Sequence, residues 1–315
     1  GFNHSANHFS MNLTLWTQGD IRILVNRETK GYASSAFAVH GTSVCDIGID
    51  VDDAKAAIER AKLLGANPFK QPIDPGQLNI PAIHGQSGSI LHFIDEKSGL
   101  SDVWDVEFTS IDEKNLGTGL TCIDHIGQTM SYEDMLSWSL FYTTLFDMGK
   151  SAMVDVVDPD GLVRSQALET PDGRLRVTLN GAETHKTMAG SFLTESFHAS
   201  VQHIAFATDD IFSTAKSLDK NGFSSLPIPA NYYADLAARF DISSDRLAQL
   251  RMSNILYDED AQGKFFQLYS RPFAGGMFFE IIQRTDGYGG YGGPNAPFRI
   301  AAQKRLMRQK GMPKI

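Results

Sequence analysis

An internal repeat constrains the fold of this chain more than any other feature of its sequence. Residues 44–65 and 201–222 lie 157 positions apart and share one plan. Each copy begins with an apolar-rich strand, continues through an Asp-Asp pair into a helix with periodic apolar residues, and ends at a glycine. Aspartate is favoured at helix N-termini, and glycine most readily adopts the positive φ that ends a helix. We therefore predict two copies of one strand-helix unit.

A third strand and helix of this kind is expected over residues 121–148, and short β-rich runs follow the helices. These runs cover residues 175–179, 253–257, 264–269 and 277–283. The order predicts an α+β fold of repeated βαβββ modules, arranged as two open barrels side by side. His125 and His203 share an early position in their strands, where the first copy has Asp46. Chemistry is therefore expected in the later copies.

The domain organisation follows from a short segment with linker composition at residues 115–119. We predict one domain over residues 1–115, without a metal site, and a metal-binding domain over residues 116–315 that ends in a helix. Residues 12–26 are typical of a β-hairpin, and no strand and helix precede them, so the first module is predicted to be truncated. The chain begins with glycine rather than methionine, and we expect a start partway into a longer protein.

The composition argues against several classes of function. Lys and Arg number 28 against 37 Asp and Glu, and a net charge of −9 disfavours a nucleic-acid partner. The longest apolar stretch, residues 135–148, is shorter than the roughly 20 residues that cross a bilayer, and no signal peptide is recognised. Cys45 and Cys122 are too few for a disulfide framework. We expect a cytoplasmic protein that binds neither nucleic acid nor membrane.

The candidate reactive residues are His125, His203 and Glu280, which are spaced by 78 and 77 positions, about one module per step. Two imidazoles and one carboxylate form the facial triad of non-haem Fe(II) oxygenases, which leaves positions open for substrate and dioxygen. A buried carboxylate in an apolar strand needs a partner. A metal is one partner for Glu280 and Arg284 is another, while His125 has Asp124 beside it as a hydrogen-bond acceptor.

The phrases around these residues resemble 4-hydroxyphenylpyruvate dioxygenase, a family of the glyoxalase-like vicinal oxygen chelate superfamily. They are Asp124-His125, Val201-Gln202-His203-Ile204-Ala205, Asp209-Asp210-Ile211, Ile228-Pro229, Tyr232-Tyr233, Phe266-Gln267 and Phe278-Phe279-Glu280-Ile281-Ile282-Gln283-Arg284. The resemblance implies that His125, His203 and Glu280 each bind a metal. Fe(II) is the expected ion, and Mg²⁺, Co²⁺ or Zn²⁺ are able to replace it.

The same resemblance implies a dioxygenase that oxidatively decarboxylates a 2-oxo acid and hydroxylates its ring, towards homogentisate when the substrate is 4-hydroxyphenylpyruvate. Asn180 and Gln267 match amide positions of the family's substrate pocket and are expected to orient the substrate. Phe298 and the last helix are expected to close over it. The chain departs from the family at Gly181-Ala182 and in residues 293–298. These departures concern the substrate pocket and leave the metal ligands in place.

A second resemblance covers nearly the whole sequence. Residues 16–26, 39–45, 231–241, 256–263 and 287–303 are similar to the C-terminal, dioxygenase-like half of bacterial two-part 3-dehydroshikimate dehydratases. In those proteins a TIM barrel removes water to give protocatechuate, and this chain has no such barrel. The alternative function is therefore a metal-binding accessory half that assembles with a TIM-barrel dehydratase domain. A homo-oligomer is expected in either case.

Other suggestive features are expected to be structural. Residues 287–292 fit G-x-G-x-x-G, but no βαβ unit surrounds them, so we predict a loop, with a lid as one role for it, rather than a dinucleotide site. The Asp-Asp pairs are expected to cap helices. His40, His84 and His92 are expected to have structural or surface roles, and Tyr232-Tyr233 to pack in the core.

Overall fold

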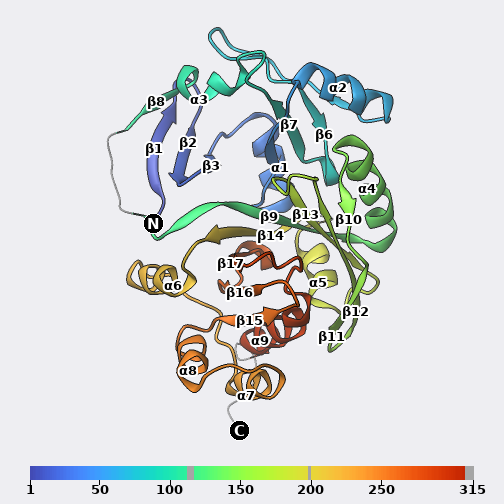
Figure 1. Cartoon of the computed structure of the whole chain (residues 1–315). Coiled ribbons are helices and arrows are strands. Elements are labelled where there is room, and N and C mark those ends of the chain that lie inside the picture. Colours follow the sequence, from blue (N-terminus) through green and yellow to red (C-terminus); the bar gives the residue numbers. More distant parts are fainter. Residues whose placement is uncertain (112–116, 198–199, 309–315) are drawn as a thin grey trace.

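The computed structural model describes residues 1–111, 117–197 and 200–308, and its centre is a curled nine-stranded sheet (Figure 1). Along the sheet the strands run β10 (Gly149–Lys150), β12 (Gly161–Glu169), β13 (Arg176–Ala182), β9 (Leu120–Ser131), β14 (Ser200–Thr208), β17 (Phe278–Thr285), β16 (Lys264–Tyr269) and β15 (Leu256–Glu259). The ninth strand, β11 (Val154–Asp158), pairs with β12. The predicted α+β class is confirmed.

Two βαβββ modules meet along the antiparallel pair of β9 and β14. In the first, β9 leads into α4 (Tyr132–Leu145), and β13 returns parallel to β9. In the second, β14 leads into α6 (Ile211–Lys220), and β17 returns parallel to β14. A parallel return requires a crossover connection, and each module helix serves as part of one. The first strand of each module therefore lies at the middle of the sheet, where both neighbours are strands.

The N-terminal part of the chain contains two four-stranded sheets (Figure 1). One has the order β3 (Ile21–Asn26), β2 (Leu13–Gln18), β1 (Asn3–His8) and β8 (Phe108–Ser110). The other has the order β4 (Asp46–Asp50), β7 (Ile90–Ile94), β6 (Ala82–His84) and β5 (Pro68–Phe69). The helices of this part are α1 (Gly31–His40), α2 (Ala54–Leu63) and α3 (Val103–Val106). The predicted hairpin of residues 12–26 is formed by β2 and β3.

The predicted domain boundary at residues 115 and 116 lies outside the described residues. We call the parts before and after this boundary the front half and the back half. The turn of the β2–β3 hairpin in the front half contacts the start of β9 in the back half. Gly19 has φ +55, and a Cβ there would lie 2.4 Å from the Thr121 carbonyl oxygen. The Asp20 amide donates to that same carbonyl at 2.7 Å. The turn needs glycine because the start of β9 leaves no room for a side chain.

Both copies of the sequence repeat fold as predicted. Asp53 is the N-cap of α2 and accepts a hydrogen bond from the Ala56 amide. Asp210 is the N-cap of α6 and accepts from two backbone amides of the first turn. Gly65 and Gly222 follow the two helices with φ of +85 and +80. The Asp-Asp pairs therefore act as helix caps, because one carboxylate of each pair satisfies amides that have no partner within the helix.

Removing the cap of α6 is expected to destabilise the protein modestly. Asp210→Ala leaves two first-turn amides of α6 without their acceptor, and we expect the free energy of unfolding to fall by about 1 kcal/mol. Asp209→Ala removes the neighbouring exposed carboxylate and is the matched control, with an expected change below about 0.5 kcal/mol. Urea unfolding of both variants measures the difference. Equal losses would show that the Asp210 carboxylate does not cap the helix.

The remaining helices are α5 (Met188–Glu195), α7 (Ala230–Arg239), α8 (Ser244–Met252) and α9 (Ala296–Arg308). Of these helices, α5 packs against β9 and β13, α9 packs against β11, and α7 and α8 pack together at the lower end of the molecule in Figure 1. The largest hydrophobic core lies between β14–β17 and the helices α6, α7 and α8, and Tyr232 and Tyr233 are buried in it. The predicted terminal helix is α9, which begins at Ala296 and is described as far as Arg308.

The helix α9 bridges two distant parts of the curled sheet. Its Ile300 packs with Val156 of β11 and Val163 of β12. Its Arg299 guanidinium lies over the ring of Phe278 in β17, with 4.7 Å between the guanidinium carbon and the ring centroid. Residues on one side of α9 therefore face the inside of the curled sheet.

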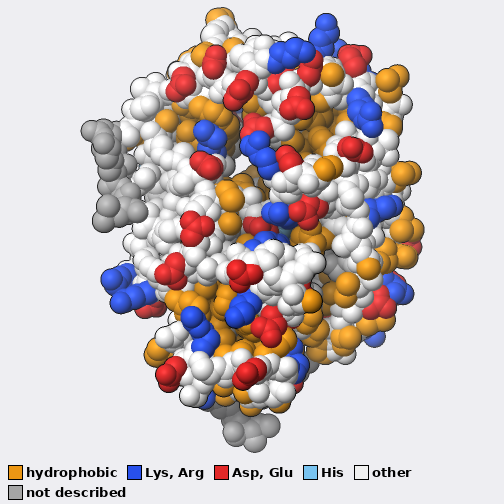
Figure 2. Space-filling model, viewed as in Figure 1, with side chains coloured by type: hydrophobic (Ala, Val, Ile, Leu, Met, Phe, Trp, Pro, Cys, Tyr) orange, Lys and Arg blue, Asp and Glu red, His pale blue; other side chains and the backbone are white. Residues whose placement is uncertain are grey.

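On the face drawn in Figure 2, acidic, basic and hydrophobic side chains are interspersed. Within the described part of the chain, no helix combines the length and apolar character needed to cross a membrane.

Candidate metal centre

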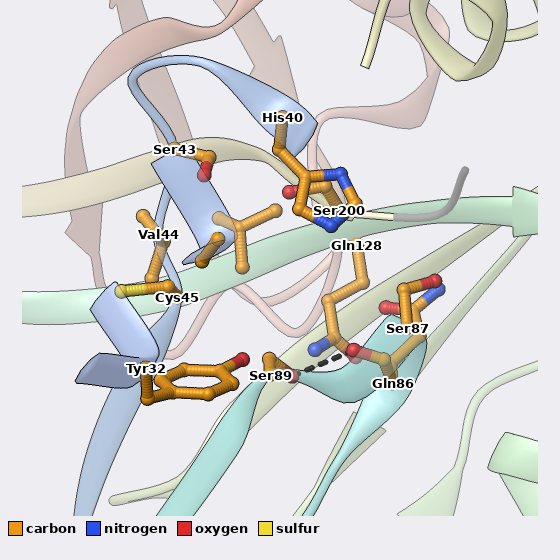
Figure 3. Close-up of a pocket in the computed structure, with 12 residues that line it drawn as sticks. Tyr32, His40, Ser43, Val44, Cys45, Gln86, Ser87, Ser89, Gln128 and Ser200 are labelled. Carbon is orange, nitrogen blue, oxygen red and sulfur yellow. Dashed lines mark hydrogen bonds between the residues drawn. The ribbon is translucent and has the colours of Figure 1, made fainter. Parts of the chain in front are cut away.

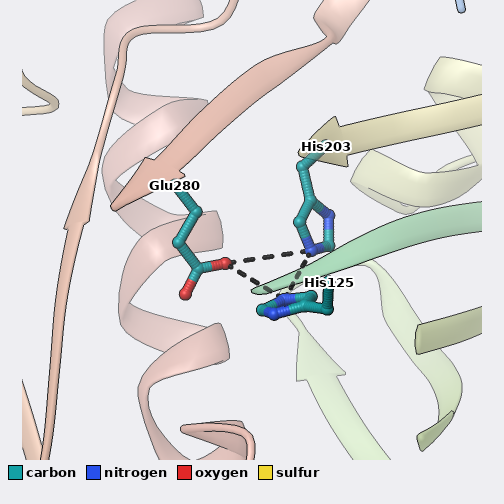
Figure 4. A group of neighbouring side chains, drawn as sticks. All are labelled: His125, His203 and Glu280. Carbon is teal, nitrogen blue, oxygen red and sulfur yellow. Dashed lines mark hydrogen bonds and ion pairs between the residues drawn. The ribbon is translucent and has the colours of Figure 1, made fainter. Parts of the chain in front are cut away.

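Three buried side chains from three neighbouring strands converge on one point (Figure 4). His125 comes from β9, His203 from β14 and Glu280 from β17. The two Nε2 atoms are 3.3 Å apart. The Glu280 Oε2 atom lies 3.7 Å from Nε2 of His125 and 3.8 Å from Nε2 of His203. The structure thus brings together all three residues that the sequence suggested as metal ligands.

The register of the central strands explains this convergence. Ala205 of β14 pairs with His125 on one side and with Glu280 on the other. Paired residues of adjacent strands project to the same face of a sheet. The His203 ring reaches the same place because it lies over Gly127 of β9, where a Cβ would stand 1.9 Å from the imidazole Cε1 atom. Glycine at this position therefore makes room for the second imidazole.

Asp124 orients the His125 ring. Its Oδ1 accepts a hydrogen bond from Nδ1 of His125 at 2.7 Å, which leaves Nε2 as the atom that faces the cluster. Arg284 donates to Asp124 at 3.0 and 3.1 Å, and Arg176 donates at 3.3 Å. Burial by itself would raise the pKa of Asp124, but the hydrogen bonds from His125 and Arg284 hold that pKa well below its usual range. Arg284 therefore pairs with Asp124 and not with Glu280.

Glu280 is held from behind by an amide network. Its Oε1 accepts a hydrogen bond from Nε2 of Gln267 at 2.7 Å, and the same nitrogen lies 2.6 Å from the Tyr269 hydroxyl. The Gln267 Oε1 accepts from Nδ2 of Asn295 at 2.8 Å, and Oδ1 of Asn295 accepts from the Tyr232 hydroxyl at 2.9 Å. With one carboxylate oxygen occupied in this way, the other oxygen of Glu280 is free to face the two histidines.

The three residues expected to contact substrate have different positions. Gln267 adjoins the cluster, but its amide group is engaged with protein partners on both atoms. Asn180 pairs with Thr129, four residues beyond His125 along β9, or about 13 Å further on. The Phe298 ring packs edge-on against Tyr232, with 5.0 Å between centroids. The structure therefore does not bring Asn180 or Phe298 into the cluster.

The donor set fits a divalent transition metal. Burial, and to a smaller extent the nearby His125 and the Arg299 guanidinium, lower the pKa of His203 well below its usual range, so this imidazole is neutral and able to donate a lone pair. Ligand atoms about 2.1 Å from a shared ion and 90–120° apart lie about 3.0–3.6 Å from each other. The separations of 3.3, 3.7 and 3.8 Å are close to that range. Two imidazoles and one carboxylate suit Fe(II), Co(II) or Zn(II).

The glycine-rich loop of residues 287–292 lies beside this centre and is tied to it. Arg284, which pairs with Asp124, also donates to the Gly290 carbonyl oxygen. The Tyr291 hydroxyl donates to Glu169 at 2.7 Å, and its ring centroid is 6.3 Å from that of His125. The prediction of a loop is confirmed. A role for it as a lid remains a prediction.

A hollow lies between the front half and the central strands (Figure 3). It is lined by α1 and the segment before β4 on one side and by β9 and β14 on the other. His40 borders it, and Nδ1 of this ring lies 2.6 Å from the Ser196 carbonyl oxygen. The His92 imidazole lies on the neighbouring sheet, 2.8 Å from Asp46, and His84 packs edge-on against Phe69. These histidines have the structural or surface positions expected of them.

Sequence reasoning missed several polar residues near the centre. Asn295, Arg299 and Gln303 belong to the segment at and before α9, and Tyr269 lies in β16. Arg299 and Gln303 are four positions apart, so in a helix they are neighbours on one face. This spacing was the available signal that the two side chains interact. The sequence does not reveal that this face points at the curled sheet.

The curled sheet of βαβββ modules defines a protein of the vicinal oxygen chelate class. Residues 1–109 match the family model of the N-terminal part of hydroxyphenylpyruvate dioxygenase. Residues 123–258 match the glyoxalase, bleomycin resistance protein and dioxygenase superfamily. The two matches together extend over the front half and most of the back half, including β9, β14 and the strand β15.

Individual relatives narrow this class to a family. A 4-hydroxyphenylpyruvate dioxygenase from Legionella pneumophila is 32% identical over 314 residues, which cover 98% of this chain and 89% of the relative. The chain belongs to the 4-hydroxyphenylpyruvate dioxygenase family.

Other relatives are twice as long. A 3-dehydroshikimate dehydratase from Pseudomonas aeruginosa is 39% identical over 309 residues, which cover 98% of this chain and 49% of the relative. A solved xylose isomerase-like TIM barrel/4-hydroxyphenylpyruvate dioxygenase fusion protein is also 39% identical, with a TM-score of 0.84, and the match covers 97% of this chain and 48% of the other. The chain thus spans about half the length of these relatives.

Proposed function

We propose that this chain is an Fe(II)-dependent oxygenase of 2-oxo acids, similar to 4-hydroxyphenylpyruvate dioxygenase. The observation that carries the proposal is the convergence of Nε2 of His125, Nε2 of His203 and Oε2 of Glu280 on one buried point. Three protein ligands leave coordination positions for the carboxylate and keto oxygens of a 2-oxo acid and for dioxygen. When bound, the iron would supply the activation of dioxygen and of the 2-oxo acid.

The residues around the cluster would position the ligands and exclude water. Asp124 holds His125 in the tautomer that presents Nε2, and Gln267 holds the inner oxygen of Glu280. Gln267 is therefore proposed to act through Glu280 rather than by touching substrate. Asn180 and Phe298 remain predicted substrate contacts, and either would have to contact a part of the substrate distant from the metal.

Oxygen consumption by iron-loaded protein tests this function. The protein is loaded with Fe(II) without oxygen, its iron content is measured, and dioxygen uptake is followed with 4-hydroxyphenylpyruvate and with other 2-oxo acids. We expect about one iron per chain and uptake of one dioxygen for each 2-oxo acid consumed. Protein that binds iron but takes up no dioxygen with any 2-oxo acid would overturn the oxygenase. Protein that binds no metal would overturn the centre itself.

A second candidate function is supported by the dehydratase relatives. Two proteins named 3-dehydroshikimate dehydratase are 39% and 38% identical to this chain and about twice its length. On this alternative, the chain is the metal-binding accessory half of such an enzyme and assembles with a TIM-barrel dehydratase domain. Iron binding without oxygen uptake, together with association with a separately produced barrel domain, is the result that favours it.

We also propose that the two halves of the chain have different roles. The front half, residues 1–115, would contribute packing and a hollow but no metal ligand, and the back half, residues 116–315, would hold the centre. The group of three ligands lies wholly in the back half. At the position in β4 that corresponds to His203, the front half has Asp46, which pairs with His92.

A further inference from the structure

The inner face of α9 carries a cation without an acidic partner. The guanidinium carbon of Arg299 lies 4.7 Å from the ring centroid of Phe278 and 5.7 Å from that of Tyr269. Across residues 1–111, 117–197 and 200–308, no carboxylate forms an ion pair with it. Its hydrogen-bonded partners are Oε1 of Gln303 at 2.7 Å and the Tyr269 hydroxyl. Arg299 is half-buried, and burial lowers the pKa of its guanidinium.

Lys304, the next cation along the same helix, differs from Arg299 because it has acidic partners. Lys304 donates to both Asp158 and Asp160 near β11. Asp158 and Asp160 are therefore already paired with Lys304. The charges of Glu280 and Asp158 act on Arg299 from a distance, but within the described residues neither forms an ion pair with it. A partly buried cation without an ion-paired carboxylate is costly, and a bound anion would offset that cost.

Gln303 adds a second unused donor beside Arg299. Its side chain is only 1% exposed, and its Nε2 has no hydrogen-bond partner within the described chain. The orientation of this amide is determined by its neighbour, because a guanidinium only donates and the oxygen of Gln303 must face it. The NH₂ group therefore lies on the other branch of the amide, and within the described residues it has no acceptor. A guanidinium with further N–H groups beside an amide nitrogen without an acceptor has the chemistry of an anion site.

This donor pair lies close to the metal centre. The Phe278 ring that supports the Arg299 guanidinium also stacks on the His203 imidazole, with 5.0 Å between centroids and 14° between planes. One aromatic ring therefore separates the donor pair from a metal ligand. Tyr269, which also contacts Arg299, lies beside Gln267 and Glu280 on the other side. A substrate bound at the cluster would extend over this part of α9.

We propose that Arg299 and Gln303 form a carboxylate receptor, and that the substrate of this centre is a 2-oxo acid with a second carboxylate. The inference rests on the proposed function, since it places the 2-oxo acid end of the substrate at the metal. The planar fork of a guanidinium matches a carboxylate with two parallel hydrogen bonds, and Gln303 Nε2 adds a third donor. 4-Hydroxyphenylpyruvate has one carboxylate, so this receptor distinguishes the substrate from it.

Matched ligand pairs test the receptor by binding rather than turnover. We would titrate anaerobic, iron-loaded full chain with phenylpyruvate against 4-carboxyphenylpyruvate, and with 2-oxopentanoate against 2-oxoglutarate, by calorimetry. In at least one pair the dicarboxylate is expected to bind at least about 10-fold more tightly. Arg299→Gln is expected to reduce that preference to within about 2-fold, Arg299→Lys to retain part of it, and Gln303→Leu to weaken it several-fold.

Arg246→Gln is the matched control. Arg246 is an exposed arginine of α8 that lies 4.6 Å over the Phe212 ring, and its variant should keep the wild-type preference. Equal affinities within both pairs in the wild type, or a preference that persists in Arg299→Gln, would overturn the receptor. Should Arg299→Gln not fold, the wild-type ratios and Arg299→Lys decide. Absence of oxygen uptake with every 2-oxo acid overturns only the proposed oxygenase, because the affinity ratios are measured without turnover.

Discussion

His203→Ala is expected to abolish metal retention and, with it, any oxygen uptake. The His203 Nε2 is one of three donor atoms that converge within 4.8 Å of each other, and its loss leaves one imidazole and one carboxylate. Replacing a residue that merely orients a ligand already costs about 10–100-fold in metal affinity, so loss of a ligand should cost more. Iron content after desalting and calorimetric titration with Fe(II) or Co(II) measure the effect directly.

His92→Ala is the control for this substitution. His92 is also a strand histidine close to an aspartate, but it lies in the front half, 2.8 Å from Asp46 and away from the cluster. Its variant should retain wild-type metal content and unfold within about 1 kcal/mol of the parent. Full metal retention in His203→Ala would contradict the proposed centre, because two of the three residues would then suffice.

Gly127→Ala is expected to disable the same centre without touching a ligand. A Cβ at this position would stand 1.9, 2.2 and 2.5 Å from Cε1, Nδ1 and Nε2 of the His203 ring. Residue 127 lies within β9 and does not have a positive φ, so alanine suits the backbone and the imidazole has to move. We expect a fall in metal affinity of at least about 10–100-fold, with the metal-free protein losing no more than about 1–3 kcal/mol of stability.

The control for this change is Gly48→Ala in β4. There a Cβ would lie 3.2 Å from the Cδ1 atom of Ile94, the flexible end of a side chain. Metal titration and urea unfolding of both variants separate an effect on the centre from an effect on folding. Wild-type metal affinity in Gly127→Ala would show that the His203 ring does not occupy the space above residue 127.

The family relationship and the donor groups of α9 bear on different parts of the proposed function. The family relationship is the basis for proposing oxygenase chemistry, and the length of the dehydratase relatives is the basis for the alternative of an accessory role. Arg299 and Gln303 bear on which ligand is bound in either case. Among the described residues, Arg299 has no ion-paired carboxylate and Nε2 of Gln303 has no acceptor, and these donor groups favour an anion. Substrate selectivity is therefore the property in which this chain is expected to differ from enzymes that act on 4-hydroxyphenylpyruvate.

Local patterns in the sequence were sufficient to predict the modules. The Asp-Asp pairs and the terminal glycines mark the beginning and end of α2 and α6, because capping depends on residues a few positions apart. The spacing of His125, His203 and Glu280 by about one module each suggested a shared site, since equivalent positions of repeated modules have equivalent places in a sheet. These predictions depend on periodicity and on short-range chemistry.

What the sequence by itself determined is the class of fold, the helix caps and the three candidate ligands. Only the tertiary structure decided which partners those ligands have. Arg284 is four residues from Glu280 in the chain, yet it pairs with Asp124 across the sheet. Gln267 holds Glu280, and Arg299 reaches Phe278, because strand register and the path of α9 bring distant segments together. Such contacts depend on packing between segments, which no local pattern of residues encodes.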